Sequence, residues 1–316
     1  MSPTHPIPLT VLAGFLGAGK TTLLNRILRE NHERRLAVLV NDFGPLNIDA
    51  RLVVGVAEDT ISLANGCICC TIRADLLRAV LQVAGRPDPP DHIVIEASGV
   101  SDPGAVAQTF TLPELRPVVR LDGVITLVDA QGAAGLTGYS NLMLDQVAGA
   151  DIVLLNKVDL VGEAERERVR DWIRSTAPRA RVLDTVQANA PLELLLGVGT
   201  DPGRLMAGDG ARDGRPGFSA WAYASDRPFR LQAVNDAFKR LPATIFRAKG
   251  ILAVAESPER RVILQMVGRH TRLTYGEPWG REPPRTEMAL IGVPGGVDAE
   301  ELARRFEACL AQPPDA

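Results

Sequence analysis

Three of the chain's four cysteines lie within four positions, at Cys67, Cys69 and Cys70. Thiols at this spacing could bind a soft metal such as Zn²⁺ or tetrahedral Co²⁺, form a disulfide switch, or serve as small buried apolar residues. In an extended strand Cys67 and Cys69 would share a face and Cys70 would point away, so the three converge only if the segment turns. Asn65-Gly66 directly before them is a turn signal. Three thiolates would leave a fourth coordination position for water, another side chain, a second copy of the chain in a homodimer, or a recipient protein.

A phosphate-binding pattern lies near the N-terminus. Residues 14–21, GFLGAGKT, match G-x-x-x-x-G-K-[ST] and stand between an apolar run and a helical pattern. The glycines allow a tight loop whose backbone N–H groups face phosphate oxygens, and the helix that follows adds its dipole. Lys20 should reach the β- and γ-phosphates, and Thr21 should offer its hydroxyl to Mg²⁺. The predicted nucleotide contacts in this loop are Gly17, Ala18, Gly19, Lys20, Thr21 and Thr22.

Carboxylates elsewhere in the chain could complete a phosphoryl-transfer site. Glu96 lies at the end of the predicted strand within HIVIEASG, where a carboxylate could hold Mg²⁺ or its water, and Gly99 could donate its N–H to the γ-phosphate. Asp42 could orient Mg²⁺ or the attacking water. An ordinary exposed carboxylate is the alternative interpretation for both Glu96 and Asp42. The predicted catalytic set is therefore Lys20, Thr21, Glu96 and Asp42.

A base-recognition pattern, NKVD, occupies residues 156–159, directly after the apolar run DIVLL. The Asp159 carboxylate can accept from guanine N1–H and from the exocyclic amine, whereas adenine offers neither in that arrangement. The Lys157 stem can cover the base, and Asn156 can bond to the base edge and to the phosphate loop. The motif predicts binding of GTP and GDP rather than ATP.

These motifs need a scaffold, and the sequence predicts an α/β one. Val/Ile/Leu-rich runs alternate with helical patterns through the first 200 residues, which indicates a mostly parallel sheet flanked by helices, as in P-loop NTPases. The Gly/Asp/Arg/Pro-rich stretch 201–217 is a predicted linker. Strands in hairpin sequence and two helices then predict a small α+β domain. The predicted domains are 1–200 and 218–316. The predicted strands are 9–14, 36–41, one within 118–130, 92–97, 151–156, 218–225, 244–254, 261–268, 272–276 and 286–293.

Composition excludes several classes of protein. The formal net charge is −3, so no global basic field points to nucleic acid or to an anionic membrane. No apolar run reaches the roughly 18 residues of a membrane span, and the N-terminus lacks the basic region of a signal peptide. Four cysteines, three of them crowded, do not form a secreted disulfide framework in a chain of 316 residues. We therefore expect a cytoplasmic protein.

Taken in order, GFLGAGKTTLLN, NDFG, NGCICCTIR, IEASGVSDP, LDGVITLVDA and NKVD resemble the CobW family of P-loop GTPases, relatives of the urease and hydrogenase nickel-insertion GTPases. FRAKGILAV and TEMALIGV are similar to the small C-terminal domain of CobW proteins. The resemblance implies a Mg²⁺-dependent, GTP-driven metal chaperone that delivers zinc or cobalt to a client metalloprotein. It also implies that the CxCC motif is the metal-binding signature.

The sequence also departs from the family pattern. Many relatives place glutamates around the N-x-F-G segment, whereas Asp42 and Asp49 supply the carboxylates here, and the linker contains no histidine. No catalytic Gln or Arg finger is identifiable, so intrinsic turnover should be slow. A GTP-dependent interaction switch with a structural zinc site and little metal transfer remains the alternative function. A nucleotide or small-molecule kinase is disfavoured by N-K-x-D.

Overall fold

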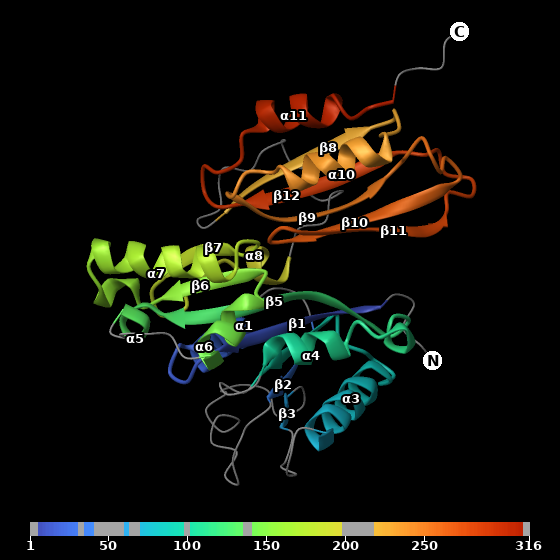
Figure 1. Ribbon diagram of the computed structural model, residues 1–316. Coiled ribbons are helices and arrows are strands. Elements are labelled where there is room, and N and C mark those ends of the chain that lie inside the picture. Colours follow the sequence, from blue (N-terminus) through green and yellow to red (C-terminus); the bar gives the residue numbers. More distant parts are fainter. Residues whose placement is uncertain are drawn as a thin grey trace. The chain divides into compact units, whose positions relative to one another are not determined.

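The computed structural model describes residues 6–30, 35–40, 60–62, 70–97, 102–134, 141–197 and 218–311. The chain divides into two compact units, Met1–Ala190 and Pro191–Ala316. Figure 1 shows the elements of both units along the chain. Each unit has a sheet and a buried apolar core of its own.

The first unit is built on a parallel sheet, as predicted. Within the described residues its seven strands lie in the order β3-β2-β4-β1-β5-β6-β7, and every neighbouring pair is parallel. Two strands were not predicted: β3 has only three residues, and β7 is an edge strand whose middle residues are half-buried, so neither has a long apolar run. The bounds are β1 Ile7–Gly14, β2 Leu36–Val40, β3 Thr60–Ser62, β4 His92–Glu96, β5 Val119–Asp129, β6 Ile152–Asn156 and β7 Arg181–Thr185.

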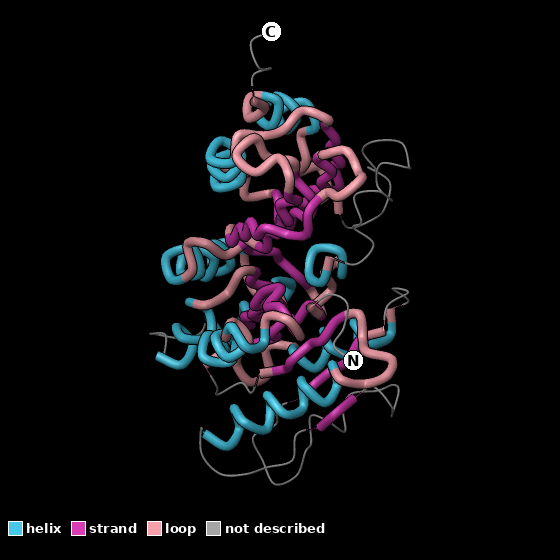
Figure 2. The backbone as a smooth tube through the Cα atoms, turned by 90° about the vertical axis from the view of Figure 1, so that its right-hand side faces the viewer, coloured by secondary structure: helices cyan, strands magenta, loops and turns pink. Residues whose placement is uncertain are grey.

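Helices flank this sheet (Figure 2). Two of them show how a helix buries its apolar side: α1 buries Leu23, Leu24 and Ile27, while α7 buries Val169 and Ile173. The helices are α1 Lys20–Arg29, α3 Cys70–Ala84, α4 Pro103–Thr109, α5 Ala130–Ala134, α6 Asn141–Ala148 and α7 Glu163–Thr176, with 3₁₀ turns η1 Pro113–Leu115 and η2 Val158–Leu160.

The second unit has an antiparallel sheet, in agreement with the predicted α+β domain. Its five described strands run in the order β11-β10-β9-β12-β8. An aromatic cluster joins the sheet to the helices, with Phe306 next to Trp221 and Phe238. The elements are α8 Leu192–Leu196, β8 Ser219–Ser225, α10 Leu231–Lys239, β9 Ile245–Leu252, β10 Arg260–Val267, β11 His270–Pro278, β12 Thr286–Gly292 and α11 Ala299–Glu307.

Helix α8 lies inside the predicted N-terminal domain, which ran to residue 200, but it belongs to the second unit. Arg247 of β9 is fully buried and donates from Nε to the Leu194 carbonyl at 3.2 Å and from Nη2 to the Leu195 carbonyl at 2.5 Å. These bonds satisfy carbonyl groups at the C-terminal end of α8. The Arg247–Leu195 bond joins residues that are 52 positions apart, so it leaves no local signal in the sequence. The predicted domain boundary therefore followed the next Gly-rich stretch instead.

Candidate functional site

The loop between β1 and α1 needs glycine at three positions. Gly14, Gly17 and Gly19 have φ of 135°, 77° and 107°, in the region that residues with a side chain rarely adopt. A Cβ at Gly14 would lie 2.4 Å from the Leu127 carbonyl oxygen, and one at Gly19 would lie 2.6 Å from Asn156 Nδ2. At Gly17 nothing lies within 4 Å. Space and backbone both require glycine at 14 and 19, and backbone alone requires it at 17.

Lys20 is the first residue of α1, and its ammonium group lies inside the loop. Its Nζ donates to the Gly14 carbonyl at 2.8 Å and to the Phe15 carbonyl at 3.2 Å, and the residue is only 8% exposed. A buried ammonium at the start of a helix places positive charge where backbone N–H groups also point, which is an arrangement suited to a phosphate. Of the neighbours, Ala18 is buried, Thr21 is half-buried and Thr22 is exposed.

Gln146 of α6 fixes the first residue of the loop. Its Oε1 accepts from the Gly14 N–H at 2.8 Å, and its backbone carbonyl accepts from Thr126 Oγ1 at 2.9 Å. The residue is 1% exposed, so the bond is shielded from water. Gln146 was not among the predicted site residues, because a glutamine in an amphipathic helix gives no sign of which residue 132 positions away it will meet.

Asn156 ends β6 and joins three parts of the first unit. Its Nδ2 donates to the Ala18 carbonyl at 2.9 Å, which is the predicted bond to the phosphate loop. Its Oδ1 accepts from the Ala188 N–H at 2.8 Å and from Thr185 Oγ1 at 3.1 Å, two partners that the sequence did not indicate. With the residue only 2% exposed, Asn156 positions the loop after β7 as well as the phosphate loop.

Lys157 and Asp159, the other two predicted contact residues of NKVD, have different surroundings. Lys157 has a left-handed backbone, with φ of 61°, and its Nζ donates to Asp129 Oδ2 at 2.7 Å. Asp129, at the end of β5, was not among the predicted site residues. Asp159 lies in η2 and is exposed, so its carboxylate is accessible to a ligand.

Glu96 lies at the carboxyl end of β4, on the edge of the sheet where the phosphate loop begins. It is paired in register with Leu12 of β1 and Val40 of β2, and it is 3% exposed. Gly14, which opens the loop, follows Leu12 by two residues. The structure therefore brings Glu96 to the same edge as the loop. Asp42 and Gly99 lie outside the described residues.

The predicted metal ligands fall largely outside the described part of the chain. Cys67 and Cys69 are not described, and Cys70 begins α3 with an undescribed side chain. Among the residues that the structure does describe, no group of three or more His, Cys, Asp or Glu side chains could hold a metal ion. Cys309 is buried in the core of the second unit.

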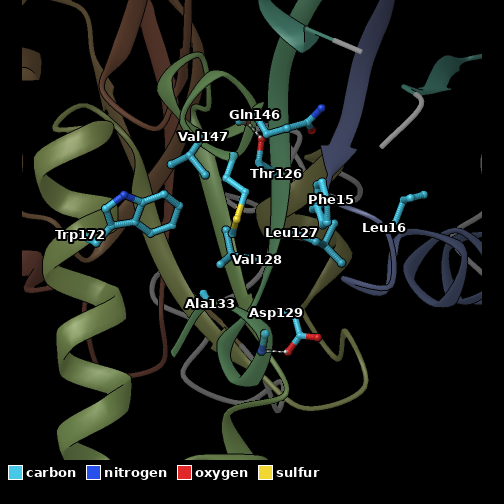
Figure 3. A pocket seen from close by; sticks show the side chains of 12 residues that line it. Phe15, Leu16, Thr126, Leu127, Val128, Asp129, Ala133, Gln146, Val147 and Trp172 are labelled. Carbon is cyan, nitrogen blue, oxygen red and sulfur yellow. Dashed lines mark hydrogen bonds between the residues drawn. The ribbon is translucent and has the colours of Figure 1, made fainter. Parts of the chain in front are cut away.

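A small cavity of about 220 Å³ adjoins the loop (Figure 3). Its walls are mostly apolar and include Phe15, Val147 and Trp172, while Asp129 and Gln146 contribute polar groups to its lining. Phe15 and Leu16 are among the exposed large hydrophobic residues, at 38% and 63%.

Within the described ranges, no helix has the length and apolar character to cross a membrane.

Comparisons with known proteins agree with this architecture. The family description "CobW/HypB/UreG, nucleotide-binding domain" matches residues 8–184, and "Cobalamin synthesis protein cobW C-terminal domain" matches residues 218–310. The zinc chaperone YjiA of Escherichia coli K12 is 35% identical over 321 residues, covering 96% of this chain and 98% of that protein. The zinc chaperone CobW of a Sinorhizobium species is 30% identical over 341 residues, covering 95% of each chain.

A eukaryotic relative extends the same resemblance. The zinc-regulated GTPase metalloprotein activator 1 of Dictyostelium discoideum is 32% identical over 323 residues, covering 85% of this chain and 68% of that protein. The family match spans the loop at 14–21, Glu96 and the NKVD motif, and the second match spans the antiparallel unit. The chain belongs to the CobW/HypB/UreG family and carries its nucleotide-binding domain together with the CobW C-terminal domain.

Proposed function

We propose that this protein is a GTP-hydrolysing metallochaperone that binds zinc through Cys67, Cys69 and Cys70 and delivers it to a client metalloprotein. The observation that carries the nucleotide part is the bond from Asn156 Nδ2 to the Ala18 carbonyl, which joins the guanine motif directly to the phosphate loop. The metal part is supported by the three clustered thiols and by relatives named zinc chaperones.

The residues of the loop fit a nucleoside triphosphate. Left-handed glycines turn the backbone around a point at the start of α1, and the Lys20 ammonium lies within that turn. Gly17, Ala18, Gly19, Thr22 and Gly99 would contribute N–H groups to phosphate oxygens. Thr21 and Glu96 would hold Mg²⁺, which neutralises charge on the phosphates, and Asp42 would orient the attacking water.

Guanine is the expected base. The exposed Asp159 carboxylate is accessible to accept from guanine N1–H and the exocyclic amine, and Lys157 would cover the ring. Wild-type protein should hydrolyse GTP slowly and leave ATP nearly untouched. Lys20→Ala should abolish GTP hydrolysis, because it removes the charge opposite the transferred phosphate. Faster hydrolysis of ATP than of GTP would contradict the proposal.

The metal is cargo in this scheme. Three thiolates suit Zn²⁺, and Co²⁺ in tetrahedral geometry is the second candidate. An incomplete ligand set suits transfer, since a client can supply the fourth ligand; a second copy of the chain in a homodimer is another source of it. If GTP changes the affinity for zinc by some factor, zinc must change the affinity for GTP by the same factor.

The decisive experiment measures zinc affinity by competition with a chromophoric chelator, with GDP and with a non-hydrolysable GTP analogue. We expect the zinc Kd to differ between the two nucleotides. We also expect the triple variant Cys67→Ser/Cys69→Ser/Cys70→Ser to lose binding while it keeps GDP affinity. Cys309→Ser is the matched control, because it removes a buried thiol far from the motif in sequence. Equal zinc affinity with both nucleotides would favour an interaction switch with structural zinc, and wild-type-like binding by the triple variant would exclude this site.

A further inference from the structure

Asp129 uses its two carboxylate oxygens for two different tasks. Oδ1 accepts from the backbone N–H groups of Gln131 and Gly132, at 3.0 and 3.2 Å, which are in the first turn of α5. Oδ2 accepts from Lys157 Nζ at 2.7 Å. The helix amides therefore fix the orientation of the carboxylate, and the second oxygen faces the lysine. Figure 3 shows Asp129 on this turn, beside the cavity.

Lys157 is constrained at both ends of its side chain. Its backbone is left-handed, with φ of 61° and ψ of 33°, and this conformation directs the first bonds of the side chain. At the other end, Asp129 holds the ammonium group. Asp129 and Asn156 are paired in register on neighbouring strands, so the carboxylate stands next to the start of the NKVD turn. The Lys157 and Asp129 side chains are 32% and 24% exposed, which places the pair partly out of water.

A lysine side chain has four rotatable bonds, so one that must cover a base loses conformational freedom when the nucleotide binds. A partner that orders the side chain beforehand removes part of that cost. We propose that Asp129 is a positioning residue for guanine-nucleotide binding: its carboxylate holds the Lys157 ammonium so that the lysine stem is already in place for the base. This inference rests on the proposed function, because it assumes that the NKVD motif binds guanine.

Lys157 would contribute to nucleotide affinity, whereas Asp159 would contribute to discrimination between bases. The Lys157 stem meets the face of the purine ring, which guanine and hypoxanthine share, whereas Asp159 reads the exocyclic amine that only guanine carries. Removing the Asp129 carboxylate should therefore lower the affinities for GDP and for IDP by the same factor. The ratio of their affinities should stay at the wild-type value, because Asp159 is unchanged.

Asp129→Asn is the sharpest variant. An asparagine oxygen can still accept from the N–H groups of Gln131 and Gly132, so the start of α5 stays capped, but the amide has no charge to hold Lys157. Asp184→Asn is the matched control. The Asp184 side chain is 25% exposed, close to the 24% of Asp129, and it pairs with Arg170 at 2.5 Å. Because Arg170 lies on α7 and not in the NKVD motif, this variant removes a similar ion pair without affecting Lys157. Lys157→Met removes the ammonium and retains an apolar stem.

The test is titration calorimetry of the full-length protein with GDP and with IDP, for wild type, Asp129→Asn, Lys157→Met, the double variant and Asp184→Asn. We expect Asp129→Asn to raise both Kd values about three- to tenfold, in proportion to one ordered long side chain. In the Lys157→Met background, Asp129→Asn should change neither value, and Asp184→Asn should bind as wild type does.

The outcomes separate the possibilities. Unchanged or tighter GDP binding by Asp129→Asn would overturn this inference and leave the proposed function intact. The same conclusion would follow if Asp129→Asn lowered GDP affinity equally in the wild-type and the Lys157→Met backgrounds. If Asp129→Asn had a lower unfolding midpoint but the wild-type Kd for GDP, the Asp129–Lys157 pair would only connect the NKVD turn to α5. That result would also overturn the inference. If wild-type protein fails to bind GDP, the proposed function falls and this inference falls with it.

Discussion

Asn156 Nδ2 donates to the carbonyl oxygen of Ala18 across 138 residues of chain, at 2.9 Å. The bond joins the NKVD turn, for which we propose base recognition, to the loop 14–21, for which we propose phosphate binding. Because the other end of the same amide accepts from the Ala188 N–H, the segments after β1, β6 and β7 form one hydrogen-bonded unit. The two halves of the proposed nucleotide site are therefore tied to each other.

Asn156→Ala should lower both stability and nucleotide affinity. It removes three hydrogen bonds of a residue that is 2% exposed and leaves the Ala188 N–H without this partner. We expect a loss of about 2–4 kcal/mol in the free energy of unfolding. Urea denaturation with and without GDP checks this, and the stabilisation that GDP gives should shrink. Stability and GDP affinity both equal to wild type would show that the network is not needed.

Gln146→Ala should mainly affect the phosphate loop. It leaves the Gly14 N–H without its buried acceptor, which costs about 1–3 kcal/mol. Gln108→Ala on the exposed side of α4 is the control, because it removes the same atoms from a solvated position. Nucleotide Kd and GTP turnover, measured side by side for the two variants, check the expectation. Equal behaviour of the two would argue against a role for Gln146 in holding the loop.

Glycine substitutions should separate backbone strain from crowding. Gly17→Ala places a methyl group in open space and carries only the strain of a left-handed residue, about 1–2 kcal/mol. Gly19→Ala carries a similar strain and also brings its Cβ to 2.6 Å from Asn156 Nδ2. We therefore expect Gly19→Ala to be the more destabilising in thermal denaturation, and to weaken GDP binding more. The reverse order would mean that the loop adopts another conformation.

The stability of the C-terminal unit should fall at high pH because of Cys309. Burial raises the pKa of this thiol above its ordinary value of 9.0, against the opposing fields of Arg230, Arg240 and Arg305. The unfolded chain then loses the thiol proton at a lower pH than the folded one. The stabilising contribution is therefore complete below pH 9.0 and is lost as the pH rises above it toward the folded-state pKa.

Cys309→Ala isolates this effect. The difference in unfolding midpoint between wild type and the variant should be constant below pH 9.0 and should move against wild type above it. The pKa of Tyr223 is also raised, chiefly by burial and least by Cys309 itself, so most of the tyrosine's contribution is common to both proteins. A difference that does not change with pH would show that the thiol titrates alike in both states.

The sequence by itself determined the chemistry that the chain can attempt and most of its framework. The glycines of residues 14–21, the NKVD motif and the alternation of apolar runs with helices are local patterns, because each depends on φ preferences, side-chain type or periodicity within a few residues. With the hairpin sequence of the later strands, they were enough to predict the loop 14–21, the mostly parallel sheet and the α+β C-terminal unit, all of which the structure contains.

Only the tertiary structure decided which side chains hold those motifs in place. Gln146 at the Gly14 N–H, Asp129 at the Lys157 ammonium and Arg247 at the end of α8 each act across 28 to 132 residues of chain. Glutamine, aspartate and arginine at such positions are compatible with many partners, and strand order selects one of them. Because parallel strands β1, β5 and β6 end at the same edge of the sheet, residues that are remote in the sequence become neighbours there.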